Sequence, residues 1–404
     1  MKFSKIGQVS LVSGIALILA STFTACNPVT IDYVFVAGDN QTTSTTPTNG
    51  EIQTFLSDRV SGALSPVNTK VSSGGVRPVS VATSTDYQHL YVANQDDSTI
   101  VEFTIDGSGK LTSTKTTTLS AEGNTPVAIA MNAAGTLLYV ANRYQPGHSS
   151  ASPSAGALAV FPVGKDGSLG ASVTNGGLNY VAVGVNPTSV NALSTGAAAY
   201  VTTYNPTAGL GFIYGFSATS GGALATLTGS PFAAGVKPSA ITSDPTGRFV
   251  YATDFSQSQL IGYSVIDQAV LHPLINGPFR TGSQPTALTI DPRGRYIYLT
   301  NSLDNTVSAY SIDLATGTPT TTVSSTGTSN LATGTQPVAI LVDPGYGRYV
   351  YTANYLDNSL TGFKLDGSTG ALTLTLNGPY PSINQPAAVA SVPRGNHSVQ
   401  VNQD

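Results

Sequence analysis

The 404-residue sequence has no tryptophan, a single cysteine and few charged residues, which make up 9% of the chain. One cysteine cannot form a disulfide within the chain, so no disulfide framework supports the fold. The formal net charge is −4 and there is no block of basic residues, which argues against nucleic acid as a partner. Hydrophobic residues still account for 40% of the chain, and strand-like runs continue to its end, which excludes a disordered protein.

The N-terminus has the pattern of an export signal. Two lysines precede an apolar stretch, Val9–Ala20, which is too short to span a membrane. The small residues Thr24 and Ala25 then precede Cys26, and this arrangement resembles the lipobox of bacterial lipoproteins. The resemblance implies a lipid on Cys26 and removal of residues 1–25. The alternative is an ordinary secretory signal with an incidental cysteine.

This N-terminal pattern also predicts where the mature protein resides. Residues 1–25 are the predicted signal peptide, and residues 26–31 are a short tether that begins at the lipidated Cys26. We therefore expect an extracytoplasmic, lipid-anchored protein of the bacterial cell envelope, located in the periplasm or on the cell surface. The expected partners are the membrane, an envelope protein, or a saccharide or other small molecule.

A repeated segment recurs along the rest of the chain. Its clearest copy is Gln284–Asp313, where three strand-like runs are separated by turns. The prolines that open the seven copies are Pro78, Pro126, Pro187, Pro238, Pro285, Pro337 and Pro386. A tyrosine follows thirteen or fourteen residues later in six copies, at Tyr91, Tyr139, Tyr200, Tyr251, Tyr298 and Tyr351. The residue two after each proline is small and the next is aliphatic, which is the alternation of a strand with one packed face.

Each copy continues with a third strand and a fourth, outer strand. The predicted third strands are Thr99–Ile105, Gly156–Val163, Gly211–Ser217, Gln259–Ile266, Thr306–Ile312 and Ser359–Leu365. A run such as Ala371–Leu376 supplies the fourth strand. Radial repetition of four-stranded antiparallel sheets predicts an all-β, seven-bladed β-propeller over residues 32–404. An elongated β-solenoid or a pair of β-sandwiches is the alternative.

The two ends of the chain supply incomplete, complementary units. Asp32–Ala37, Glu51–Ser57 and Ala63–Val71 form a second, third and fourth strand without a proline-led first strand. Pro386–Val392 forms a first strand alone. Joining the two ends predicts a seventh blade that closes the ring and leaves no open edge. Ser398–Asn402 competes with Asp32–Ala37 for the second strand, and the N-terminal segment is favoured.

We expect a ligand to bind at one mouth of the central channel, where the loops before the prolines and after the tyrosine strands meet. Arg77, Lys237 and Arg143 would make this mouth weakly positive and attract an anionic sugar or a carboxylate, unless they are only solubilising charges. The aromatic residues expected at the same mouth are Tyr144, Tyr204, Phe255 and Tyr355. Such rings stack on sugars or on the side chains of a partner, although they also plug tight propellers.

Candidate catalytic residues are few, because the seven first strands carry no Asp, Glu, His, Lys or Arg before their turns. No paired carboxylates are available for acid–base chemistry and no cluster of carboxylates predicts a metal site, so neither a metal nor a cofactor is expected. His148 and Arg143 lie in a long insertion between a second and a third strand, and they are the candidates for a base and an anion clamp. The alternative is a Ser-rich surface loop that happens to hold a histidine.

Several motifs resemble those of the seven-bladed lactonase-type propellers, also called the YVTN-repeat or 6-phosphogluconolactonase-like family. They are DPRGRYIYLTN at Asp291–Asn301, GSPF at Gly229–Phe232, LYVAN at Leu90–Asn94 and Leu138–Asn142, and VYTAN at Val350–Asn354. The resemblance covers nearly all of the mature chain and implies the same propeller fold. Some relatives are described as 6-phosphogluconolactonases, others resemble carboxymuconate cycloisomerases, and many are envelope proteins without known chemistry.

These observations favour a binding or scaffold protein displayed on the envelope, without a strong catalytic site. Relatives with sugar-lactonase activity tend to carry a His-containing run where one blade passes to the next. The corresponding runs here contain no histidine, at Arg77–Ser80, Asn186–Ser189 and Lys237–Ala240. The alternative is a lactonase that hydrolyses a sugar lactone with Arg143 and His148, so the sequence leaves open whether the chain is an enzyme. A quinone-dependent dehydrogenase is disfavoured, because the chain lacks tryptophan platforms and the acidic metal ligands expected of one.

Overall fold

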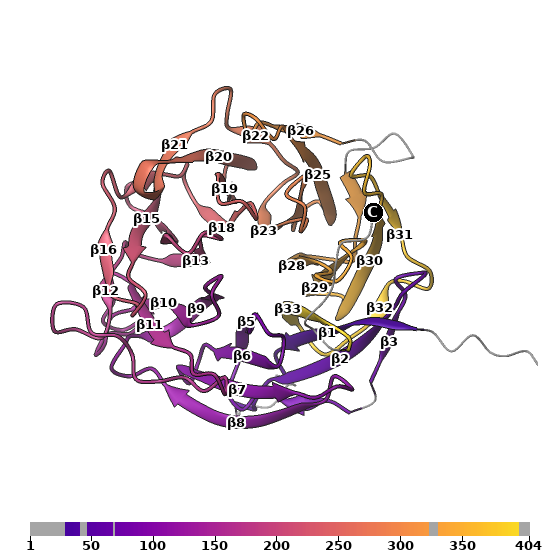
Figure 1. The fold of residues 1–404 in the computed structure, drawn as a ribbon, viewed down its shortest axis with the longest axis horizontal. Coiled ribbons are helices and arrows are strands. Elements are labelled where there is room, and N and C mark those ends of the chain that lie inside the picture. Colours follow the sequence, from indigo (N-terminus) through magenta and orange to yellow (C-terminus); the bar gives the residue numbers. More distant parts are fainter. Residues whose placement is uncertain (1–28, 41–46, 68, 323–329, 396–404) are drawn as a thin grey trace, which may run out of the picture.

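The computed structural model describes residues 29–40, 47–67, 69–322 and 330–395. They form a ring of seven antiparallel sheets, or blades, around a central axis, and Figure 1 shows this ring along its axis. Apart from one 3-10 turn, η1 (Asp267–Ala269), the elements in the described part of the chain are strands. The prediction of an all-β, seven-bladed propeller is therefore confirmed.

Blades 1 to 3 follow one another along the chain, and each begins with an inner strand that contains the proline of the repeat. Blade 1 contains β5 (Pro78–Thr83), β6 (His89–Asn94), β7 (Thr99–Ile105) and β8 (Leu111–Thr118). Blade 2 contains β9 (Asn124–Met131), β10 (Leu137–Tyr144), β11 (Ala157–Pro162) and β12 (Val181–Ala182). Blade 3 contains β13 (Pro187–Ala192), β14 (Ala198–Asn205), β15 (Leu210–Ala218), β16 (Leu224–Thr226) and β17 (Phe232–Ala233).

Blades 4 to 6 repeat the arrangement, and in each the outer strand is split into two short pieces that pair with the third strand. Blade 4 contains β18 (Pro238–Ser243), β19 (Phe249–Asp254), β20 (Gln259–Ile266), β21 (Val270–Pro273) and β22 (Phe279–Arg280). Blade 5 contains β23 (Pro285–Ile290), β24 (Tyr296–Asn301), β25 (Thr306–Ile312), β26 (Pro319–Thr321) and β27 (Asn330–Ala332). Blade 6 contains β28 (Pro337–Val342), β29 (Tyr349–Asn354), β30 (Ser359–Leu365), β31 (Leu372–Leu374) and β32 (Tyr380–Pro381).

Blade 7 joins the two ends of the chain. Its strands are β33 (Pro386–Pro393), β1 (Thr30–Gly38), β2 (Glu51–Asp58), β3 (Leu64–Pro66) and β4 (Val71–Ser72). Strand β1 pairs with β33 on one side and with β2 on the other, so Val34 faces both Ser391 and Phe55. The predicted closure by Asp32–Ala37 is therefore confirmed, whereas the competing segment Ser398–Asn402 lies outside the described residues.

The outer strand of blade 7 differs from its prediction. Ala63–Val71 was expected to be one strand, but it contains β3 and the start of β4, which pair with different parts of β2. Pro66 ends β3 because proline has no N–H to donate to the ladder.

The hydrophobic core lies in layers between neighbouring blades. The aliphatic residue three positions after each proline belongs to these layers, as predicted. Ile129 packs in the same cluster as Tyr91 between blades 1 and 2, and Val190 packs with Tyr139 between blades 2 and 3. Each blade therefore needs its neighbours to bury its faces, which is why the ring must close.

The tyrosines of the repeat form hydrogen bonds between neighbouring blades. The phenol donates a hydrogen bond to a backbone carbonyl of the following blade in five cases: Tyr91 to Gly167, Tyr200 to Ala269, Tyr251 to Gly317, Tyr298 to Gly370 and Tyr351 to Gly62. These side chains are fully buried. Burial raises the pKa of Tyr298 far above its usual value, so the phenol stays protonated and remains a donor.

We expect Tyr298→Phe to lower the free energy of unfolding by about 1–3 kcal/mol, because the buried Gly370 carbonyl loses its donor at 2.9 Å. Tyr180→Phe is the matched control, since the half-buried Tyr180 donates no hydrogen bond from its phenol to another described residue. Chemical denaturation of both variants measures the difference. Equal stability of the two variants would show that the inter-blade bond contributes nothing.

Candidate functional site

One mouth of the channel is built by the same backbone pattern in all seven blades. The proline of each blade pairs with a residue of the second strand, and we call the residue that follows this partner the rim residue. The rim residues of blades 1 to 7 are Gln95, Arg143, Tyr204, Phe255, Ser302, Tyr355 and Asp39. The pre-proline residues of the same blades are Arg77, Thr125, Asn186, Lys237, Gln284, Gln336 and Gln385. The two predicted loop classes therefore do meet at one mouth.

Backbone hydrogen bonds hold the rim residue beside the pre-proline residue. The rim N–H donates to the pre-proline carbonyl at 2.9 Å in Gln95–Arg77, Phe255–Lys237 and Tyr355–Gln336, at 3.0 Å in Ser302–Gln284 and at 3.3 Å in Tyr204–Asn186. Because this bond recurs around the ring, it belongs to the fold. The five blades that share this bond differ at the mouth through the side chains that they present there.

A cavity of about 220 Å³ lies at this mouth beside blades 6, 7 and 1. Its polar lining residues are Asp39, Arg77, Gln336, Tyr355 and Gln385, and its apolar ones are Pro78, Val79, Val338 and Ala387. One guanidinium nitrogen of Arg77 lies 3.5 Å from Asp96 in an exposed ion pair. The remaining guanidinium donors can serve a ligand. Residues that carry a carboxylate, a guanidinium, two amides and a phenol thus line one cavity, and such a set can hydrogen-bond the hydroxyls of a sugar.

A second group of predicted residues lies across the mouth, at blades 3 and 4. The Lys237 ammonium lies 4.4 Å from the ring centroid of Phe255 and 5.4 Å from that of Tyr204. These cation–π contacts hold the lysine at the mouth without neutralising its charge. The structure therefore brings Lys237, Tyr204 and Phe255 together at blades 3 and 4, and all three are predicted ligand-binding residues. It brings Arg77 and Tyr355 together in the cavity at blades 6, 7 and 1.

The predicted pair of Arg143 and His148 is not joined by a hydrogen bond in the described part of the chain. Arg143 is half-buried on the rim of blade 2, and its Nε is buried without a hydrogen-bond partner among the described residues. His148 lies in the loop between β10 and β11, where its Nδ1 is 3.1 Å from the carbonyl oxygen of Ser152. Its own carbonyl accepts a hydrogen bond from Asn124 at 3.0 Å. The hypothesis of a base and an anion clamp stays a prediction.

Three of the four predicted aromatic residues are rim residues: Tyr204, Phe255 and Tyr355. Tyr144 is not, because it lies one residue beyond the rim residue Arg143 and pairs with Asn124. Strands β9 and β10 continue past the proline in blade 2, and Tyr144 belongs to this extension.

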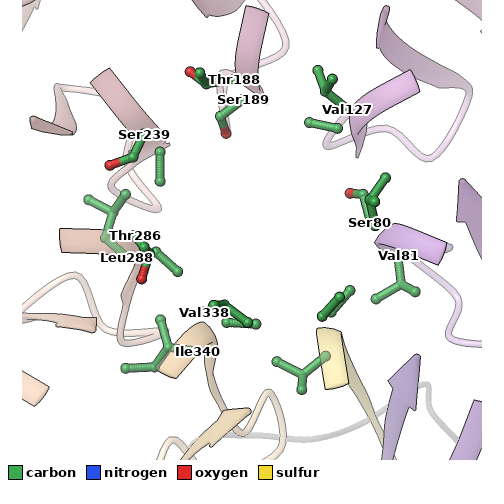
Figure 2. A pocket seen from close by; sticks show the side chains of 18 of the residues that line it. Ser80, Val81, Val127, Thr188, Ser189, Ser239, Thr286, Leu288, Val338 and Ile340 are labelled. Atoms are coloured by element: carbon green, nitrogen blue, oxygen red, sulfur yellow. The ribbon is translucent and has the colours of Figure 1, made fainter. Parts of the chain in front are cut away.

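Below the mouth, the channel is lined by the first strands, whose side chains Figure 2 shows around a cavity of about 240 Å³. The hydroxyls of Thr188, Ser239 and Thr286 donate to the carbonyl of the next blade's proline at 2.8, 2.6 and 2.8 Å, respectively. These hydroxyls therefore hold neighbouring blades together. No ionisable side chain is among the described residues that line this part of the channel.

Asp39 is a residue of the candidate site that sequence reasoning missed. It lines the cavity with Arg77 and is the one carboxylate among the fourteen rim and pre-proline residues. The predicted strand ended at Ala37, so the residues after it were not aligned with the other blades. An alignment of the blades could have located Asp39. Gly38 pairs with the proline of blade 7 as Asn94 pairs with the proline of blade 1, and Asp39 therefore corresponds to Gln95.

The cavity has the groups that hydrolysis of an ester requires. A carboxylate can accept a proton from an attacking water, and a guanidinium can stabilise the negative charge that develops on the carbonyl oxygen. The described residues contain no group of three His, Cys, Asp or Glu side chains placed to hold a metal ion. None of the helices in this part of the chain is long and apolar enough to cross a membrane.

Comparison with known proteins identifies a family. The family model for "Lactonase, 7-bladed beta-propeller" matches residues 41–192 and 198–404. A search of curated proteins found no significant match. The match to the family model contradicts the prediction of a non-catalytic binding or scaffold protein, and it supports the alternative of a lactonase. The prediction was wrong because it relied on the uncharged first strands and on a missing histidine run, whereas the charged groups lie on the rim.

Solved structures share the fold. A periplasmic gluconolactonase from Pseudomonas aeruginosa is 19% identical, with a TM-score of 0.72 over 90% of this chain and 100% of that one. A candidate 6-phosphogluconolactonase from Bacteroides fragilis is 19% identical, with a TM-score of 0.71 over 91% of this chain and 99% of that one. A second candidate 6-phosphogluconolactonase, from Bacteroides uniformis, is 18% identical, with a TM-score of 0.68 over 90% and 99%. At these identities the similarity establishes the fold.

Proposed function

The chain belongs to the family of seven-bladed β-propeller lactonases, and on this premise we propose that it hydrolyses a sugar lactone in the cavity at the rim mouth. The observation that carries the proposal is the convergence of Asp39 and Arg77 on one cavity that is also lined by Gln336, Tyr355 and Gln385. The amides and the phenol suit the hydroxyls of a sugar ring, and a volume of about 220 Å³ accommodates a monosaccharide-sized ligand.

The proposed reaction uses two charged residues. Asp39 acts as the general base that takes a proton from water as the water oxygen attacks the lactone carbonyl carbon. Arg77 stabilises the negative charge on the carbonyl oxygen of the tetrahedral intermediate. The intermediate collapses with cleavage of the bond between the carbonyl carbon and the ring oxygen, and the proton on Asp39 passes to the departing alkoxide. The product is the open-chain sugar acid, and Asp39 returns to its carboxylate form.

The proposed location is the cell envelope. The signal pattern of residues 1–25 and the lipobox-like position of Cys26 support export and lipid anchoring, although both lie outside the described residues. One structural neighbour is a periplasmic protein, which is consistent with an extracytoplasmic place of action. Radioactive palmitate incorporation that is lost in Cys26→Ser would support the lipid anchor, and unchanged incorporation would exclude it.

A panel of sugar lactones tests the activity. We expect the purified protein to release acid from at least one aldonolactone faster than the spontaneous reaction, as measured by proton release at constant pH. The same panel is run with Asp267→Asn, which removes an exposed carboxylate at η1 on the outside of blade 4 and should leave the rate unchanged. Absence of acceleration across neutral and anionic aldonolactones would contradict the proposed function.

A further inference from the structure

We propose that the end of the ring away from the rim lies on the membrane, where Arg59, Arg348 and Arg394 bind the phosphates of anionic phospholipid headgroups. We call these three residues the arginine cluster. The inference rests on the proposed location in the cell envelope, and it places the rim mouth on the aqueous side. The partner is a bilayer surface that contains phosphatidylglycerol.

The direction of β1 places the start of the described chain at the end of the ring away from the rim. Gly38, at the end of β1, pairs with the proline that opens blade 7 and precedes the rim residue Asp39. Asp32, near the start of β1, pairs with Pro393, the last residue of β33. Because a strand rises about 3.3 Å per residue, the nine residues of β1 extend over about 30 Å between these two ends.

The proposed lipid anchor is close to the same end of the ring. Three peptide bonds join Cys26 to Val29, and a chain spans at most about 3.6 Å per residue, so the two residues are within about 11 Å of each other. The carbonyl of Val29 accepts the backbone N–H of Arg59 at 2.8 Å, and that of Ile31 accepts the backbone N–H of Arg394 at 2.8 Å. A lipid on Cys26 therefore brings both arginines to the bilayer and leaves the rim mouth pointing away from it.

The guanidinium groups of the arginine cluster are available to a ligand. All three arginines are exposed, and among the described residues no carboxylate oxygen lies within 4.0 Å of their guanidinium nitrogens. The ring centroid of Tyr346 lies 5.8 Å from the guanidinium carbon of Arg59 and 5.3 Å from that of Arg348. These contacts hold two cations beside one ring without neutralising them, and each guanidinium can bind a phosphate through paired N–H donors.

The carboxylates near the arginine cluster accept backbone N–H groups. Asp343 is fully buried and accepts four of them, and Asp58 accepts those of Val60 and Ser61 at 3.2 and 2.8 Å. These carboxylates lower the local positive potential, and the whole chain has a net charge of −4. Direct contact between guanidinium and phosphate, and not long-range attraction, therefore carries the binding.

Exposed apolar side chains accompany the arginines. Val60, next to Arg59, is 77% exposed, and Val29 is 56% exposed. Surfaces that lie on a bilayer combine cations, which contact the headgroups, with apolar side chains, which enter the boundary between headgroups and acyl chains. Both kinds of side chain meet here, at the point where the chain from Cys26 reaches the ring.

Sedimentation with lipid vesicles tests the arginine cluster without the anchor. The protein is produced without residues 1–25, which retains every strand of the ring and leaves no lipid attached. We expect it to bind vesicles of phosphatidylglycerol and phosphatidylcholine in equal parts, and not vesicles of phosphatidylcholine alone. Combined substitution of Arg59→Gln, Arg348→Gln and Arg394→Gln should weaken binding about a hundredfold, or roughly fivefold for each arginine.

Two triple variants control for charge and folding. Lysine at all three positions of the arginine cluster keeps the charge and should retain most of the binding. Lys70→Gln, Lys237→Gln and Arg280→Gln together remove the same charge from the rim end of blades 7 and 4, and this variant should bind like the wild type.

A single introduced tryptophan reports the orientation, because the chain has none of its own. The protein without residues 1–25 is coupled through Cys26, its only cysteine, to a maleimide lipid in vesicles of phosphatidylglycerol and brominated phosphatidylcholine. Val60→Trp should lose most of its fluorescence to the bromine atoms. Leu303→Trp is the matched control, since Leu303 is 62% exposed and follows the rim residue Ser302, and it should keep its fluorescence.

Equal binding of the wild type and the glutamine variant to anionic vesicles, or equal binding of the wild type to both kinds of vesicle, would overturn the arginine cluster. Equal quenching of the two tryptophans would overturn the orientation. These measurements involve no turnover, so their outcome is independent of the lactone panel. If palmitate incorporation is unchanged in Cys26→Ser while vesicle binding still depends on the arginines, the proposed anchor is refuted and the headgroup-binding surface is supported.

Discussion

Asp39→Asn is expected to lower kcat for lactone hydrolysis by about a hundredfold to ten-thousandfold, the usual contribution of a positioned general base. Asparagine keeps the shape of the side chain and its hydrogen bonds to a sugar, but it cannot accept the proton of the attacking water. Arg77→Met should lower kcat by about a hundredfold to a thousandfold, because the developing oxyanion loses its positive partner. In both variants kcat should fall more than KM rises, since each group acts mainly on the transition state.

Two controls separate catalysis from folding. Arg295→Met removes an exposed arginine in the turn between β23 and β24, which lies at the other mouth, and it should keep full activity. Thermal unfolding of Asp39→Asn and Arg77→Met should match the wild type, because both residues are at the surface of the mouth and not in the core. If Asp39→Asn retains more than about a tenth of the wild-type kcat, Asp39 is not the base.

Stability is expected to fall as the pH rises above about 4, through a buried carboxyl pair at the ring closure. Asp32, in β1 of blade 7, is fully buried and interacts with Asp343 of blade 6, while the Asp343 carboxylate accepts backbone N–H groups from Tyr346, Gly347, Arg348 and Tyr349. Burial raises the pKa of Asp343 as well, while these N–H groups lower it and so stabilise its charged form. Burial first, and then the charge of Asp343, raise the pKa of Asp32 well above its usual value, so Asp32 is the protonated member of the pair.

The sign of the effect follows from proton linkage. An acid with a raised pKa in the folded state binds a proton that the unfolded chain releases above a pH of about 4. The free energy of unfolding then decreases by about 1.4 kcal/mol per pH unit, until the pH passes the pKa of Asp32 in the folded protein. Asp32→Asn removes the titrating proton of Asp32 and should lose the part of the slope that comes from it, so it should be more stable than the wild type at alkaline pH.

Urea denaturation across a pH series measures this prediction. Asp267→Asn, at an exposed position, should keep the wild-type slope. Identical slopes in the wild type and Asp32→Asn would show that Asp32 is ionised in the folded protein. The neighbouring Tyr87, whose pKa is raised by burial, stays neutral through this range and does not contribute to the slope.

The fold could be predicted from the sequence because its determinants are local and repeated. Each proline marks the first strand, and in six of the seven copies a tyrosine thirteen or fourteen residues later marks the second, so the strand order can be predicted without long-range information. The closure by β1 and β33 could be predicted by counting strands. The N-terminal segment lacked a first strand, and the C-terminal segment supplied a first strand alone. The predicted strand bounds were less accurate where the pairing between strands extends past the repeated motif, as at the end of β10.

The site was predicted only in part, because its residues come from blades that are distant in the chain. Arg77, Lys237, Tyr204, Phe255 and Tyr355 were predicted to lie at the mouth, since each stands beside a proline or after a tyrosine strand. Their division into two groups depends on which blades face each other, and only the ring shows this. Asp39 was missed because blade 7 has Phe35 where the other blades have tyrosine, so the motif that located the rim elsewhere is absent there.

Hydrolysis in water enriched in oxygen-18 is the most direct test of a lactonase in which water attacks the carbonyl. The wild-type protein should produce the open-chain sugar acid faster than the spontaneous reaction, with one heavy oxygen in its carboxylate group, as measured by mass spectrometry. Asp39→Asn should return the rate to near the spontaneous one. A wild-type protein that leaves every aldonolactone at its spontaneous rate, or an Asp39→Asn variant as fast as the wild type, would contradict the account.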